Sequence, residues 1–174
     1  MILIHFFKLV IFSFSPGNPI ANLVGLVVGD KLGFTATYSS STTRFGVNLQ
    51  DADNNYVFRI AFRQAGDIGG PISVMSSRTD GIWGAESRAA FPAFEDGVEF
   101  CIMIECQFDK FVVSFNGVPL EGVVFPYRYD LASVAAIKLW GGAAKGDGNA
   151  IFWNTFTLPV AQHNPDPAEE DPEN

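Results

Sequence analysis

Charged residues, cysteine and histidine are scarce in this chain, and each shortage excludes a class of protein. Only 17% of the 174 residues are Asp, Glu, Lys or Arg, which leaves little sequence that could form a solvated helix. The two histidines, His5 and His163, lie at opposite ends of the chain, and no Cys-x-x-Cys motif occurs. The ligands of a metal site are therefore lacking, and we expect no metal and no other cofactor.

Basic residues are too few for a nucleic-acid-binding surface. The net charge is −8, and the 11 Lys and Arg residues form no basic stripe. Five of the 19 acids fall in residues 161–174, a Pro-rich stretch without aromatic residues, which cannot bury enough apolar area to become ordered. We predict one folded domain over residues 1–160, a disordered acidic tail over residues 161–174, and no nucleic-acid partner.

The apolar run at the N-terminus, MILIHFFKLVIFSF, has two interpretations, a β-strand and a signal peptide. His5 and Lys8 interrupt the run, and it has no basic start and no small-residue cleavage site. It is also shorter than the roughly 20 residues that span a bilayer. We expect a strand and no membrane insertion, with a signal peptide as the alternative.

The two cysteines, Cys101 and Cys106, lie five positions apart in one predicted strand. An odd spacing places their side chains on opposite faces, so they cannot easily pair with each other. Two buried thiols suit a reducing compartment better than a disulfide framework does.

Phe and Gly are abundant, with 17 of each beside 10 Pro, a composition typical of short apolar strands separated by turns. Turn signals include Asp80-Gly81 and Asn116-Gly117, and Phe100–Phe115 predicts a hairpin around Phe108-Asp109. The predicted strands cover about residues 31–38, 44–50, 55–63, 71–77, 98–107, 110–116, 119–125, 133–140 and 150–159. This pattern predicts an all-β sandwich.

The strand RIAFR, residues 59–63, separates polar from apolar side chains. Arg59, Ala61 and Arg63 fall on one face, while Phe58, Ile60 and Phe62 fall on the other. Two guanidinium forks on either side of an alanine can donate paired hydrogen bonds to hydroxyls or carboxylates. The alternative is an exposed face whose charges serve solubility.

The segment WGAESR, residues 83–88, adds the other parts of a sugar site. Trp83 offers a flat apolar platform, Glu86 an acceptor and Arg88 a donor fork within about 20 Å of extended chain. A pyranose ring lies with its C–H face on an aromatic ring while its hydroxyls bond to charged groups. The alternative for Trp83 is a core or turn aromatic.

These segments resemble the sequences of a known protein family. RIAFR and SSRTDGIWGAESR (residues 76–88), followed by FEDGVEFCIMIECQFDKFVVSFNG (residues 94–117), resemble the galectin family, and especially fungal fruiting-body galectins. The resemblance covers about residues 30–158. It implies a galectin-type jelly-roll β-sandwich of two antiparallel sheets, concanavalin A-like, with five and six strands and with β-galactosides held on the concave face of the larger sheet.

Carried over residue by residue, the resemblance implies that Trp83 stacks on the sugar and that Glu86, Arg88 and Arg63 hydrogen-bond to it. Three positions depart from the family pattern: Arg59 stands where the family has His, and Ala61 and Ser76 stand where it has Asn. The candidate carbohydrate-binding residues are Arg59, Arg63, Ser76, Arg78, Trp83, Glu86 and Arg88.

The departure at Arg59 bears most on specificity. A guanidinium offers no acceptor and fills the space near the axial 4-hydroxyl of galactose, which the family's His, Asn and first Arg read together. The expected function is a lectin with altered glycan specificity, for acidic glycans or for GlcNAc-containing ones. The alternative is a galectin fold that has lost sugar binding and acts by self-association or through a protein partner.

An enzyme is not expected. Glycoside hydrolases need two carboxylates about 5 to 9.5 Å apart, and Glu86 has no evident acidic partner on the predicted strands. A homodimer or higher oligomer, paired through an edge strand or the N-terminal segment, is expected. Because galectins typically lack a signal peptide, the resemblance implies cytoplasmic synthesis with export by an unconventional route.

Overall fold

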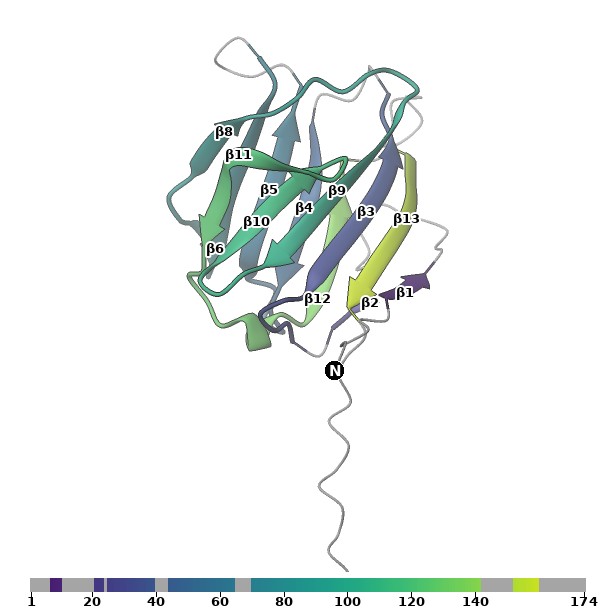
Figure 1. Ribbon diagram of the computed structural model, residues 1–174. Helices are drawn as coiled ribbons and strands as arrows, with labels where there is room; N and C mark the ends of the chain where they lie inside the picture. Colours follow the sequence, from purple (N-terminus) through teal and green to yellow (C-terminus); the bar gives the residue numbers. More distant parts are fainter. Residues whose placement is uncertain are drawn as a thin grey trace, which may run out of the picture.

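The computed structural model describes residues 7–10, 21–23, 25–39, 44–64, 70–141 and 152–159, and for residues 7–10, 21 and 152–159 it describes the backbone alone. The described chain forms two antiparallel sheets that lie face to face (Figure 1). This confirms the predicted all-β sandwich. The predicted tail, residues 161–174, and most of the turns predicted at 67–71 and 141–148 lie outside the described residues.

One sheet has six strands in the order β1-β13-β3-β9-β10-β11, and its strands β9 and β10 form the hairpin predicted around Phe108-Asp109. Its β1 confirms the strand expected in the apolar N-terminal run and pairs with β13. The bounds are β1 (Phe7–Val10), β3 (Lys31–Thr37), β9 (Glu99–Cys106), β10 (Lys110–Phe115), β11 (Val118–Pro126) and β13 (Phe152–Pro159).

The other sheet has seven strands in the order β2-β12-β4-β5-β6-β7, with β8 also paired to β6. Its bounds are β2 (Ala21–Asn22), β4 (Arg44–Gln50), β5 (Tyr56–Arg63), β6 (Ile72–Thr79), β7 (Ile82–Trp83), β8 (Ser87–Ala90) and β12 (Ala136–Trp140). Each sheet thus has one strand more than the resemblance implied.

Three short strands, β2, β7 and β8, were not predicted, because two to four residues are too few to show an alternating pattern. The strand predicted over 133–140 is also wrong at its start. A 3-10 helix, Leu131–Ser133, comes first, and its N-cap Asp130 accepts a hydrogen bond from the backbone N–H of Ala132. The strand itself begins at Ala136.

Both predicted two-residue hairpin turns are present. Asp80 and Gly81 have φ of 50° and 81°, and Asn116 and Gly117 have φ of 48° and 82°. Positive φ at both central residues gives the turn twist that matches paired strands, and Asn, Asp and Gly adopt it at least cost. The first turn matters for function because it sends the chain from β6 directly into Trp83.

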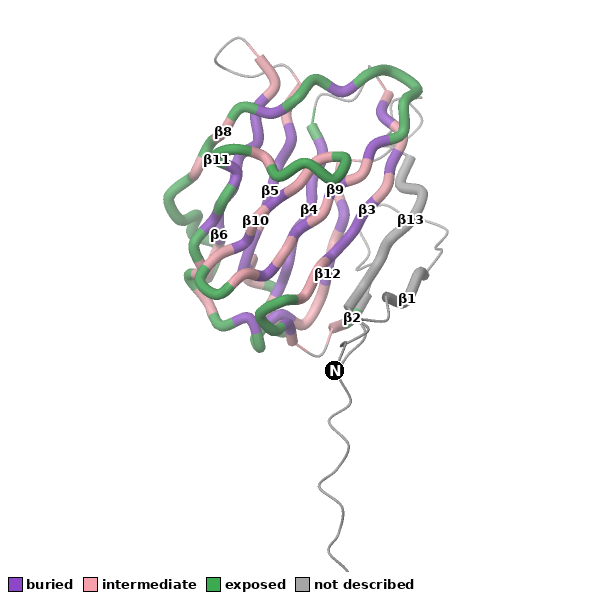
Figure 2. Tube along the Cα trace, in the orientation of Figure 1, coloured by how far each residue is buried: buried purple, intermediate pink, exposed green. Residues whose placement is uncertain are grey.

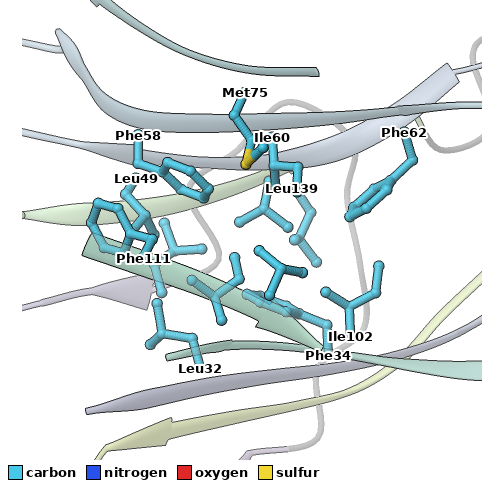
Figure 3. Packing of buried hydrophobic residues seen from close by; sticks show 14 of the residues in the cluster. Leu32, Phe34, Leu49, Phe58, Ile60, Phe62, Met75, Ile102, Phe111 and Leu139 are labelled. Atoms are coloured by element: carbon cyan, nitrogen blue, oxygen red, sulfur yellow. The ribbon is translucent and has the colours of Figure 1, made fainter. Parts of the chain in front are cut away.

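Large aromatic and aliphatic side chains fill the space between the sheets (Figure 3). Phe58, Ile60 and Phe62 of β5 are fully buried on this side, as predicted. The ring of Phe58 lies 4.5 Å from that of Phe111 on β10 and 5.5 Å from that of Phe125 on β11, so it joins the two sheets. Buried and partly exposed residues alternate along β9 and β10 (Figure 2).

The cysteines follow this alternation. Cys106 is buried in the core, and Cys101 is partly exposed on the opposite face of β9. Both are free thiols, which confirms that they do not pair with each other.

Candidate functional site

The outer face of the seven-stranded sheet, turned away from the core, carries a shallow groove. Ala61 on β5 and Val74 on β6 are partners in the sheet, and their short side chains line the floor of this groove. The groove has a volume of about 190 Å³ and is lined by Arg44, Arg59, Ala61, Arg63, Val74, Ser76, Trp83, Glu86 and Trp140.

Arginines stand at both ends of this floor. Arg44 on β4 pairs with Arg63 on β5 at one end, and Arg59 lies four residues before Arg63 at the other. In an extended strand this spacing places the backbones of Arg59 and Arg63 about 13 Å apart. The predicted cationic face of β5 is therefore present, and β4 adds a third guanidinium that was not predicted.

Arg59 is held among aromatic rings. Its guanidinium carbon lies 4.2 Å from the centre of the Trp140 ring, 5.1 Å from that of Trp83 and 6.0 Å from that of Tyr56. All three distances are within the range of cation–π attraction. The Arg59 side chain makes no hydrogen bond or ion pair with any residue that the structure describes. Its long side chain thus occupies space beside Trp83.

Trp83 is 48% exposed, as a stacking platform must be. Its position is fixed by the turn between β4 and β5. The carboxylate of Asp51 accepts hydrogen bonds from Asp53 and Asn55, and Asn55 accepts one from the backbone N–H of Asp80. This links the two turns and brings Tyr56 to 5.5 Å from the ring of Trp83.

Glu86 and Arg88 form the predicted acceptor and donor pair. Arg88 donates to one carboxylate oxygen of Glu86 from two nitrogens, at 2.9 and 2.6 Å. Glu86 lines the groove, while Arg88 is not among the lining residues. Arg88 therefore reaches the groove through Glu86, which it orients.

Ser76 and Arg78, both predicted as carbohydrate-binding residues, are less accessible from the groove than that prediction implies. Ser76 lines the groove but is only 4% exposed, and its hydroxyl donates to the carbonyl oxygen of Gly84 at 3.0 Å. Arg78 does not line the groove. Its guanidinium lies 5.6 Å from the ring of Trp83 and 5.5 Å from that of Tyr56, so it supports the aromatic wall.

Sequence reasoning missed Arg44 and Trp140. A signal for Trp140 was present in the strand AIKLW, where Lys138 and Trp140 alternate with the buried Ile137 and Leu139. That alternation places Trp140 on the outer face. Its ring packs against a small apolar cluster of Ala61, Ile72 and Val74, separate from the main core.

The groove is positively charged. Its nine lining residues include three arginines and one acidic residue, Glu86. Burial lowers the pKa of Arg59 from its usual value, Tyr56 opposes this shift, and the cations of Arg44, Arg63 and Arg78, each with a smaller effect than Tyr56, lower the pKa further.

Metal and membrane features give no alternative site in the described part of the chain. No three His, Cys, Asp or Glu side chains gather there as metal ligands would. Among the described residues, no helix has the length and hydrophobicity needed to cross a bilayer.

The family model for galactoside-binding lectin matches residues 20–144, which include the whole groove. The chain is a galectin. It is 32% identical over 104 residues to galectin-1 of Rhinella arenarum, covering 58% of this chain and 74% of that protein. It is 31% identical over 75 residues to galactoside-binding soluble lectin 13 of Homo sapiens, covering 43% of this chain and 49% of that protein.

Solved galectin structures share the fold. Sheep galectin-11, in complex with glycerol, has a TM-score of 0.67 at 23% identity and covers 83% of this chain and 100% of its own. Toad ovary galectin, in complex with thio-digalactose, has a TM-score of 0.65 at 23% identity, covering 82% and 98%. Galectin LEC-6 of Caenorhabditis elegans has a TM-score of 0.67 at 20% identity, covering 85% and 95%. This galectin therefore has the predicted jelly-roll sandwich, and it belongs to a family of non-catalytic lectins.

Proposed function

We propose that this galectin binds glycans in the groove of its seven-stranded sheet and prefers those that carry an acidic group. The observation that carries the proposal is the set of guanidinium groups on Arg44, Arg59 and Arg63, which line a groove whose acid, Glu86, is already bonded to Arg88. A sulfate or carboxylate would form charge-assisted hydrogen bonds there that a neutral sugar cannot form.

In this proposal the sugar ring stacks on Trp83, and Glu86 accepts hydrogen bonds from its hydroxyls. Ser76 contributes less than an asparagine would, because its hydroxyl already donates to Gly84. Arg78 and Arg88 act indirectly, through Trp83 and Glu86.

The test is a glycan array at low and moderate salt, with Trp83→Ala on the same slides. The array should include lactose, 3′-sulfated lactose, sialylated lactose and chitotriose. Acidic glycans should give the strongest signals, which should weaken with salt and disappear in the variant. A preference for chitotriose would instead support the GlcNAc alternative.

A galectin fold without useful sugar affinity is the second candidate, and one observation favours it. The Arg59 guanidinium carbon lies 5.1 Å from the centre of the Trp83 ring and 4.2 Å from that of the Trp140 ring, where the guanidinium competes with a neutral sugar ring for the aromatic surface. An array without any signal from the folded protein would support this candidate and overturn the first.

We also infer that the protein acts as a homodimer, made in the cytoplasm, whose two grooves would give avidity on a glycan-bearing surface. Strand β11, at the edge of the six-stranded sheet, supports edge pairing as the route. Light scattering coupled to size-exclusion chromatography measures the mass directly. A monomer at all concentrations would contradict this part of the proposal.

A further inference from the structure

Trp140 reaches the groove because β4 has no side chain at the crossing point. Trp140 on β12 pairs with Gly46 on β4, which in turn pairs with Ala61 on β5. A Cβ at position 46 would lie 2.9 Å from the Trp140 ring and would collide with the carbonyl oxygen of Ile60. The indole therefore lies over β4, toward β5.

Arg59 meets this indole from the next outer-face position of β5. It is two residues from Ala61 and pairs with Asn48 and Ser76. Of the three rings around its guanidinium, that of Trp140 is the closest. A guanidinium over a ring face keeps its N–H donors in its own plane, where they stay available to another partner.

The indole N–H does not explain why a tryptophan stands at position 140. Its Nε1 is buried and has no hydrogen-bond partner within the described part of the chain. A buried donor without a partner is costly, and it cannot contact a ligand. The contribution of Trp140 to the groove is therefore its ring face.

We propose that Trp140 is the positioning residue that sets the charge preference of the groove, by holding the Arg59 guanidinium where it binds an anionic substituent of a sugar and excludes a neutral ring. This inference rests on the proposed lectin function. Arg44 and Arg63 complete the cationic set of the groove. Without the indole, Arg59 is free to turn toward solvent and the groove opens to neutral sugars.

The test measures dissociation constants for 3′-sulfated lactose and for lactose by isothermal titration calorimetry. The proteins are the wild type, Trp140→Ala, Trp140→Phe, Arg59→Ala and the double variant Trp140→Ala/Arg59→Ala. The matched control is Phe108→Ala, which removes an 88% exposed aromatic ring from the hairpin between β9 and β10. Circular dichroism confirms that each protein is folded.

The ratio of the two dissociation constants should fall about tenfold in Trp140→Ala, which corresponds to about 1.4 kcal/mol. Trp140→Phe should keep part of the preference because a smaller ring still attracts the cation. In the Arg59→Ala background, removing Trp140 should change the ratio no further, since the two residues act as one unit.

An unchanged ratio in both Trp140 variants, or an equal effect of Trp140→Ala with and without Arg59, would overturn the inference while leaving the lectin function intact. Wild-type protein that binds neither sugar would overturn the proposed function itself, and with it this inference.

Discussion

Arg88 donates two hydrogen bonds to the same carboxylate oxygen of Glu86, at 2.9 and 2.6 Å. The two residues lie on one short stretch of chain, and both side chains are 42% exposed. The pair therefore contributes little to stability. Its consequence is for binding, because the charge of Glu86 is balanced by Arg88 and is not available to neutralise the arginines of the groove.

Replacing Glu86 with Gln separates the effect of this ion pair on stability from its effect on binding. We expect the free energy of unfolding to change by less than about 1 kcal/mol, because an exposed ion pair is worth no more. Sugar binding should weaken about tenfold or more, because Gln accepts from hydroxyls less strongly and is no longer oriented by an ion pair with Arg88. Urea denaturation and calorimetry measure the two effects. A large loss of stability with unchanged binding would contradict the interpretation.

Replacing Gly46 with Ala should damage both the fold and the groove. The added Cβ meets the Ile60 carbonyl and the Trp140 ring, and overpacking of this kind costs about 1–3 kcal/mol. Gly70→Ala is the control, because a Cβ there has no heavy atom of a described residue within 4 Å, and it should change stability by less than about 0.5 kcal/mol. Equal urea midpoints for the two variants would show that Gly46 is not a close-approach position.

Replacing Phe58 with Ala tests the junction between the sheets. Phe58 is fully buried against Phe111 and Phe125, and we expect a loss of about 3–5 kcal/mol of unfolding free energy. Phe108→Ala, at an 88% exposed position, should cost less than about 0.5 kcal/mol. Guanidinium unfolding followed by far-UV circular dichroism measures both, and similar losses would contradict the assigned core.

Alkaline pH should destabilise the protein. Burial, with a smaller effect of Asp30, raises the pKa of Cys106 to about 12, and burial also raises the pKa of Tyr127. An acid with a higher pKa in the folded chain gives its full stabilisation below its unfolded pKa, about 8.5 for a thiol. That stabilisation is lost as the pH rises toward the folded value.

The free energy of unfolding should therefore fall between about pH 9 and about pH 12. Urea titrations at several pH values measure the slope. Cys106→Ala should make it shallower, since the thiol no longer ionises on unfolding, whereas Cys101→Ala should change it less because Cys101 is partly exposed. Equal slopes in the wild type and Cys106→Ala would contradict the prediction.

The sequence predicts the long strands and the two faces of β5 because alternation over eight residues is a strong signal. It predicts Trp83, Glu86 and Arg88 because they lie within six residues of one another. Trp140 is more than fifty residues from Trp83 in the chain, and only the strand order β12-β4-β5-β6 brings the two rings to the same guanidinium.

The role of Ser76 could not be predicted in full for a second reason. Its place on the outer face follows from alternation along β6, but its hydrogen bond to Gly84 depends on how the chain after β7 folds back along β6. The same holds for Arg78, which lies beside Trp83 because the Asp80-Gly81 turn is tight. No pattern within either segment specifies these contacts.

The most direct test of the central claim is calorimetric titration of the wild-type protein with lactose and with 3′-sulfated lactose at about 50 mM and about 300 mM salt. The sulfated sugar should bind at least about tenfold more tightly at the lower salt concentration, and its advantage should shrink at the higher one. Lactose binding as tightly as the sulfated sugar at low salt would contradict an anion-selective groove.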